Sequence, residues 1–276
     1  EKSTMYKVVK LRWKFFIIIT VFLVVCMIAL LVGSTVNAGT QTEDYIHLYP
    51  NLNAEAEAPV TQNGKKAYIT FDDGPSKVTP DILDTLQSLD VKATFFVIGA
   101  TQERDIDTLK RIHNEGHAIG IHSYSHKYNE IYRSVENYLE DFNEIEDWIF
   151  EITGEHTQIF RFPGGSNNAT AKKGIMTSIA TEMTRRGYVY YDWNVIARDD
   201  KKTVYSADRL FENVKSSSKG KLNRDLILLF HDNATRKTTV EVLPRVISYL
   251  KENGYDFEKI TPATTPIQFN KPQLQK

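Results

Sequence analysis

Two adjacent carboxylates, Asp72 and Asp73, come directly after the short apolar run of residues 68–71 and before a Gly-Pro pair. An unpaired carboxylate loses several kcal/mol of solvation free energy on burial, so two buried carboxylates require a cation or hydrogen-bond donors. Taken alone, the cluster is also compatible with a surface turn of sequence Asp-Asp-Gly.

Two histidines, His122 and His126, follow a second apolar run that ends at Ile121. If this segment is helical, residues i and i+4 share one face and their ring nitrogens can hold one metal ion. Two histidines and one carboxylate form an open zinc site that leaves positions for water and substrate. The alternative is a pair of surface histidines on a loop.

Three further polar clusters follow apolar runs, at residues 161–167, 191–194 and 226–232. Arg161 beside a carboxylate site would keep an acidic partner ionised and oriented. Pro163, Gly164 and Gly165 permit a tight backbone path whose amides could face a developing oxyanion. His231 ends an apolar run and would serve as a general acid if a carboxylate orients it. Each cluster alone also fits an ordinary loop or a structural histidine.

Strands that alternate with helices must position these clusters. The expected strands are residues 67–71, 93–98, 118–121, 158–162, 188–193 and 226–230. The expected helices are residues 80–89, 106–114, 135–153, 170–186, 207–216 and 239–253. This alternation indicates βαβ units and a parallel sheet, either a barrel or an open doubly wound sheet. The clusters favour a (β/α) barrel, because barrel enzymes assemble their sites at the carboxyl ends of the strands.

The N-terminal residues predict a membrane anchor. A basic segment, residues 1–14, precedes an apolar run over residues 15–36, which is long enough to span a bilayer as a single helix. The basic flank places the N-terminus in the cytoplasm and everything after the anchor outside. A cleaved signal peptide is the alternative, and it would secrete the protein. Residues 37–65 read as an extracytoplasmic linker, residues 66–260 as the catalytic domain, and residues 261–276 as a poorly ordered tail.

Charge and cysteine content exclude several classes of function. The formal net charge is −1, but residues 1–14 carry a net charge of +4, so the rest of the chain sums to −5. The remaining chain therefore lacks the basic excess that nucleic-acid binding requires. Cys26, the single cysteine, lies in the apolar run, so the catalytic region contains neither a disulfide nor a thiolate ligand.

The motifs Thr-Phe-Asp-Asp-Gly-Pro (residues 70–75) and His-Ser-x-x-His (residues 122–126) resemble those of polysaccharide deacetylases with a NodB homology domain, carbohydrate esterase family 4. The resemblance covers roughly residues 66–260. It implies a distorted (β/α) barrel. It also implies that Asp72 is the general base, that Asp73, His122 and His126 bind Zn²⁺ or another divalent ion such as Co²⁺ or Ni²⁺, and that Arg161 pairs with Asp72.

The same resemblance implies the roles of the remaining site residues. The Gly164 amide would hold the oxyanion, and His231 would protonate the leaving amine with Asp192 orienting it. Trp193 and Leu229 would form an apolar pocket for the acetyl methyl group. The chain has Gly164 where family members often carry a bulky aromatic residue or Arg, which predicts a more open groove wall.

The sequence Arg-Phe-Pro-Gly-Gly-Ser resembles a subset of the family from spore-forming Gram-positive bacteria. We therefore expect the substrate to be N-acetylglucosamine of cell-wall peptidoglycan. Chitin, xylan or another acetylated glycan is the alternative, as is a catalytically weak wall-binding module. We expect a monomer that contacts the membrane through its N-terminal helix, acts on an acetylated polysaccharide and binds no nucleic acid. It would be a single-pass cell-membrane protein with an extracytoplasmic catalytic domain.

Overall fold

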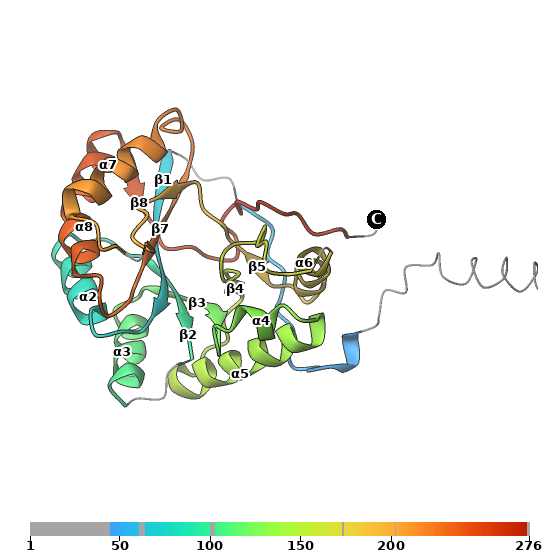
Figure 1. Cartoon of the computed structure of the whole chain (residues 1–276). Coiled ribbons are helices and arrows are strands. Elements are labelled where there is room, and N and C mark those ends of the chain that lie inside the picture. Colours follow the sequence, from blue (N-terminus) through green and yellow to red (C-terminus); the bar gives the residue numbers. More distant parts are fainter. Residues whose placement is uncertain (1–44, 61–63, 100–102, 173, 202, 275–276) are drawn as a thin grey trace, which may run out of the picture. The chain divides into compact units, whose positions relative to one another are not determined.

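A parallel sheet lies at the centre of the chain (Figure 1). Its strands are β1 (Lys65–Gly74), β2 (Thr94–Ile98), β3 (Ala118–Ser123), β4 (Ile159–Phe160), β5 (Val189–Tyr190), β6 (Val195–Ile196), β7 (Leu226–His231) and β8 (Tyr255–Phe257). Their order is β5-β4-β3-β2-β1-β7-β6, and β8 also pairs with β1. The central strands read as continuous apolar runs because helices and loops bury both of their faces.

This computed structural model describes residues 45–60, 64–99, 103–172, 174–201 and 203–274. The predicted cytoplasmic segment (residues 1–14) and the predicted anchor (residues 15–36) lie outside this part of the chain. Among the described residues, no helix has the length and apolar character needed to cross a bilayer.

Helices surround the sheet in an arc. They are α2 (Thr79–Ser88), α3 (Glu103–Asn114), α4 (Tyr128–Ile131), α5 (Val135–Thr153), α6 (Ile175–Arg185), α7 (Ala207–Ser218) and α8 (Lys237–Glu252). Neighbours along the arc are α7, α8, α2, α3, α5 and α6 (Figure 1). The longest, α5, begins where the Ser134 hydroxyl accepts a hydrogen bond from the Asn137 amide, and it ends at Gly154 in the left-handed conformation.

The sheet is a half-barrel that stays open between β5 and β6. These strands lie at opposite edges of the sheet, although only residues 191–194 separate them in the chain. The predicted parallel α/β fold of barrel type is therefore confirmed in this open form. The strands expected over residues 158–162 and 188–193 are cut to two residues each, because the chain leaves the sheet there to enter the site.

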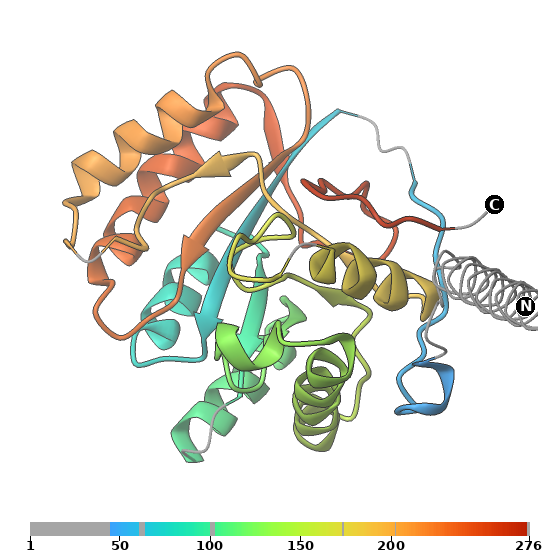
Figure 2. The same cartoon turned by 45° about the vertical axis from the view of Figure 1, so that its right-hand side comes forward.

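The C-terminal residues differ from the expectation of a poorly ordered tail. Residues 261–274 run beside α6, as the dark red segment of Figure 2 shows. The Gln273 amide donates to the Thr181 hydroxyl of α6, and the Tyr191 hydroxyl donates to the Thr261 carbonyl. This segment therefore belongs to the folded unit.

Part of the predicted linker is also folded onto the domain. The buried Arg186 guanidinium donates to the backbone carbonyls of Tyr45, Leu48, Tyr49 and Leu52. The Glu182 carboxylate balances its charge at 2.7 Å. Carbonyls that gather around one buried cation hold the segment in a fixed path, so residues 45–54 do not act as a free spacer.

Candidate active site

The carboxyl ends of β1, β3 and β7 meet at a pocket of about 450 Å³. All of the predicted site residues line this pocket except Arg161 and Asp192, which lie buried. The pocket has the place expected for a (β/α) fold, since the carboxyl ends of parallel strands converge on one edge.

Asp73, His122 and His126 bring three donor atoms together at the floor of the pocket. The Asp73 Oδ1 atom lies 3.3 Å from His126 Nε2 and 3.6 Å from His122 Nε2. All three donor atoms lie within 4.8 Å of one another, and no other such group occurs in the described part of the chain. Two imidazoles and one carboxylate with this spacing fit a divalent metal ion and leave the pocket side open.

The structure also fixes which ring nitrogen of His122 faces the donor group. Its Nδ1–H donates to the Arg161 carbonyl at 2.8 Å, so Nε2 is free to act as a ligand. Burial and the neighbouring His122 lower the pKa of His126, which favours the neutral imidazole that metal binding requires. Both ligand histidines are therefore prepared in the correct tautomer or charge state.

The second histidine is not placed by a helix. His122 ends β3, and the chain then turns so that His126 has a φ of 55°, in the left-handed region. Asp141 of α5 holds this turn by accepting hydrogen bonds from the Ser123 hydroxyl at 2.6 Å and the Tyr124 amide at 2.8 Å. The Ser123 hydroxyl in turn accepts from the His126 amide. Sequence reasoning missed Asp141 because its position inside a helix gives no sign of a loop partner.

Asp72 and Arg161 form a buried ion pair beside the donor group. Arg161 Nη1 donates to Asp72 Oδ1 at 2.7 Å and to the Thr70 hydroxyl at 2.6 Å. Its Nε donates to the Tyr191 carbonyl, and its guanidinium lies 4.2 Å from the centre of the Phe96 ring. These contacts fix the Asp72 carboxylate in the lining of the pocket, paired with Arg161 as expected from the sequence.

His231 ends β7 and pairs in register with Asp72 of β1, and the partner of its side chain is Asp199. His231 Nδ1–H donates to Asp199 Oδ1 at 2.8 Å, and Asp199 Oδ2 accepts from the His231 amide and the Thr239 hydroxyl at 2.9 Å each. Burial opposes the charged imidazole, but the hydrogen bond and the charge of Asp199, together with nearby carboxylates, raise the pKa of His231 to about 9. A protonated His231 is suited to donate a proton.

The predicted contact between Asp192 and His231 is therefore wrong. The Asp192 carboxylate instead accepts hydrogen bonds from the amide and hydroxyl of Ser166. Asp199 follows β6, and a strand of two residues leaves no periodic pattern in the sequence. The pair Asp199-Asp200 after the apolar residues 195–197 was the only signal that could have identified it.

The predicted open wall at Gly164 is filled by a tyrosine. Gly164 has a φ of 76°, and a Cβ on it would lie 3.0 Å from Tyr128 Cε1 and 2.5 Å from Asn168 Nδ2. A side chain at position 164 would be strained by this φ and would have to displace Asn168 and the Tyr128 ring, and Tyr128 itself lines the pocket. Trp193 and Leu229, the residues expected to form an apolar pocket, line the pocket together with Ile196.

A carboxylate base, a protonated histidine and a three-donor metal site around one pocket can hydrolyse a carbonyl compound with an amine leaving group. Comparison with known proteins agrees with this chemistry. The family model for polysaccharide deacetylase matches residues 60–178. The chain is 35% identical to YheN of Bacillus subtilis, a protein named for the same family, over 74% of this chain and 70% of the relative. It is 31% identical to a peptidoglycan-N-acetylglucosamine deacetylase of Bacillus cereus, over 82% of this chain and 83% of the relative.

Solved structures give the same result. The catalytic domain of peptidoglycan N-acetylglucosamine deacetylase from Eubacterium rectale superimposes with a TM-score of 0.71 at 34% identity, covering 79% of this chain and 97% of that domain. A polysaccharide deacetylase from Bacillus cereus superimposes with a TM-score of 0.63 at 30% identity, covering 74% of this chain and 97% of that structure.

Proposed function

The chain belongs to the polysaccharide deacetylase family, and we propose that it removes N-acetyl groups from the N-acetylglucosamine of peptidoglycan. One observation carries this proposal. Asp72 and His231, each held by a buried partner of opposite charge, face one pocket that also contains a metal-ligand group. Amide hydrolysis needs this combination, because one group must accept a proton from water and another must give one to the leaving nitrogen.

We further propose that Asp73, His122 and His126 hold Zn²⁺ or a similar divalent ion such as Co²⁺ or Ni²⁺. A divalent ion in this position supplies a Lewis acid that polarises the carbonyl and makes water easier to deprotonate. The ligand set of two histidines and one carboxylate supports zinc over the oxygen-rich sites that Ca²⁺ and Mg²⁺ prefer.

The protein side chains then divide the proton transfers. Asp72 accepts a proton from the attacking water while Arg161 keeps the carboxylate in place. The Gly164 amide donates a hydrogen bond to the oxyanion that forms on the former carbonyl oxygen. His231 gives its Nε2 proton to the sugar nitrogen as the C–N bond breaks, which yields acetate and a free amine. Trp193 and Leu229 receive the methyl group.

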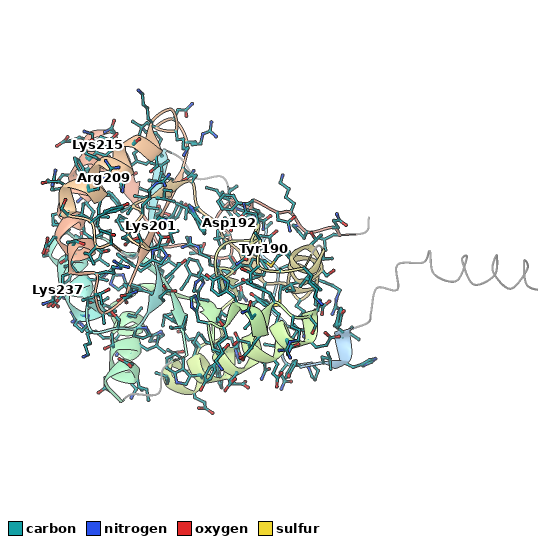
Figure 3. The ribbon with its side chains drawn as sticks, viewed as in Figure 1. Tyr190, Asp192, Lys201, Arg209, Lys215 and Lys237 are labelled. Carbon is teal, nitrogen blue, oxygen red and sulfur yellow. The ribbon has the colours of Figure 1, made fainter. Side chains whose placement is uncertain are left out.

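The substrate class is inferred from relatives and from the rim of the pocket. The relatives named above include peptidoglycan deacetylases. The exposed Arg198 lies at the rim together with Lys201, which Figure 3 labels and which pairs with Asp200 at 3.2 Å. Peptidoglycan bears carboxylates on its peptide stems, whereas chitin is neutral, so the exposed Arg198 supports the wall polymer, while Asp200 balances the charge of Lys201. An N-terminal anchor over residues 15–36 would keep this unit, as a monomer, beside the wall.

Acetate release from purified peptidoglycan, chitin oligomers and acetylxylan tests the proposal. We expect the highest kcat/KM on peptidoglycan, loss of activity after treatment with a chelator, and recovery when Zn²⁺ is added back. Higher kcat/KM on chitin or acetylxylan would reassign the substrate. Binding to peptidoglycan without acetate release, at full zinc occupancy, would show a wall-binding module instead.

A further inference from the structure

Asp192 is a buried carboxylate that joins two segments far apart in the sequence. Asp192 is only 1% exposed to solvent. Oδ1 accepts from the Ser166 amide at 2.8 Å, and Oδ2 accepts from the Ser166 hydroxyl at 2.6 Å and from the Phe269 amide at 2.7 Å. One carboxylate thus satisfies donors from the loop after β4 and from the C-terminal segment at once.

The loop that carries Gly164 is packed directly on this carboxylate. Gly165 has a φ of 84°, and a Cβ there would lie 3.3 Å from Asp192 Oδ1 and 3.1 Å from the Trp193 ring. The Gly165 amide donates to the Phe162 carbonyl at 2.8 Å. The backbone between Phe162 and Ser166 is therefore fixed at both ends, with the Gly164 amide between them.

The C-terminal segment reinforces the same loop at a second point. The Asn270 amide donates to the Ser166 hydroxyl at 2.9 Å, and the Ile267 carbonyl accepts from the Asp192 amide at 2.8 Å. The Phe269 ring meets the Trp193 ring edge-on, with centroids 5.2 Å apart. The segment lies against β5, at one edge of the opening of the half-barrel. There the side-chain amide of Gln268 donates to the Tyr190 carbonyl.

We propose that residues 261–270 help to position the catalytic centre and that Asp192 is a positioning residue for the Gly164 amide. The inference rests on the proposed function, because it assigns Gly164 the oxyanion. Asp192 and Phe269 do not touch the reacting atoms. They act by setting where the Gly164 N–H points and where the Trp193 wall of the acetyl pocket lies.

Asp192→Asn is the first test. The amide group keeps the size of the side chain but places an NH₂ against an N–H or O–H donor. We expect kcat to fall by about 100-fold, because a displaced oxyanion donor or a shift of about 1 Å costs that much. KM should change by less than about threefold, and zinc content should be unchanged. The acid and alkaline limbs of the pH profile of kcat should stay at the same pH. Unchanged kcat in folded, zinc-loaded protein, or a moved alkaline limb, would overturn the assignment.

Substitutions of the exposed Phe269 test the C-terminal segment without disturbing the core. Phe269→Pro removes the amide donor to Asp192, whereas Phe269→Ala keeps the donor and removes only the ring. We expect the proline variant to lose more kcat than the alanine variant, with Leu274→Ala, a more exposed residue of the same segment, as an unaffected control. Equal kcat for the proline and alanine variants would contradict a role for the hydrogen bond.

Hydrogen exchange separates this inference from the proposed function. Exchange of the Ser166 amide is measured on the free protein, so the result does not depend on any substrate. We expect faster exchange in Asp192→Asn and Phe269→Pro than in wild type and Phe269→Ala. Unchanged exchange would refute the positioning role, whereas faster exchange in a protein that releases no acetate from any glycan would refute the proposed function alone.

Discussion

One half of the pocket, the ligand half, carries the proposed metal ligands and comes from the ends of β1 and β3, which both pair with β2. The other, the oxyanion half, is where we propose that Gly164 holds the oxyanion, on a loop that follows a strand of only two residues. Asp72 is paired in register with both β2 and β7, whereas Asp73 and His122 each lie at a register shift, between residues that are paired with β2. The loop around Gly164 is held through Ser166, which bonds to Asp192 and to the C-terminal segment, both remote in the chain. The Tyr132 hydroxyl and the Asn168 side-chain amide also donate to the Pro163 carbonyl of the same loop.

This difference shows that neighbouring strands can place one half of a pocket while contacts between residues far apart in the sequence place the other half. In the ligand half, the functional residues lie within or directly beside paired strands, and Asp141 holds the turn that carries His126. In the oxyanion half, we expect loss of one remote contact to displace the Gly164 amide without changing any residue that lines the pocket. Substitutions in the two halves should therefore have different signatures.

The largest effect is expected from removing a ligand. His122→Ala should reduce zinc content to well below one ion per chain. It should also lower kcat/KM by roughly 1,000-fold or more, because a bound metal ion lowers the activation free energy by several kcal/mol. Zinc analysis and acetate release measure both. His113→Ala, which changes a histidine at the end of α3 outside the pocket, is the control and should keep both values. A zinc content equal to that of wild type in His122→Ala would remove this residue from the ligand set.

Asp72→Asn should keep the metal but lose the base. We expect kcat to fall by about 100- to 10,000-fold, the usual contribution of general base catalysis, while zinc content stays near that of wild type. The variant leaves the buried Arg161 charge without its partner, so circular dichroism must first confirm a folded protein. Full activity in folded Asp72→Asn would exclude Asp72 as the base.

The smallest effect is expected for Asp199→Asn, and it is visible in the pH dependence. His231 must be protonated to act as an acid, so activity falls as the pH rises through its pKa. Loss of the Asp199 charge lowers this pKa from its raised value, so the alkaline limb should move to lower pH, with about tenfold lower activity above the optimum. A bound divalent ion repels the imidazolium in both proteins, so the two profiles are compared with each other. An unmoved limb would show that Asp199 does not control His231.

Strands with clear apolar runs were predictable from the sequence, and so were the residues at their ends. The runs before Asp72, His122 and His231 are long enough to indicate strands, and their polar ends point to one edge of the sheet. The helix α5 was predicted with its observed bounds because its apolar positions recur with helical spacing between Ser134 and Gly154.

The remaining parts of the fold and site depend on contacts that leave no local pattern. The strand β6 has two residues, so Asp199 could not be placed at a strand end. The tail was assigned by its composition, yet backbone amides at Phe269 and Asn270 bind Asp192 and Ser166, and backbone amides have no sequence signature. The family resemblance implied that Asp192 orients His231, whereas the Asp192 carboxylate bonds to Ser166 in the structure.

The mutual exclusion of Tyr128 and a side chain at position 164 has an evolutionary consequence. The two positions are epistatic, since a larger residue at 164 is blocked while Tyr128 and Asn168 keep their present places. A lineage can place a larger residue at 164 only if Asn168 and residue 128 move or become smaller before, or together with, that change. A bulkier residue at 164 would accordingly need matched changes at positions 128 and 168.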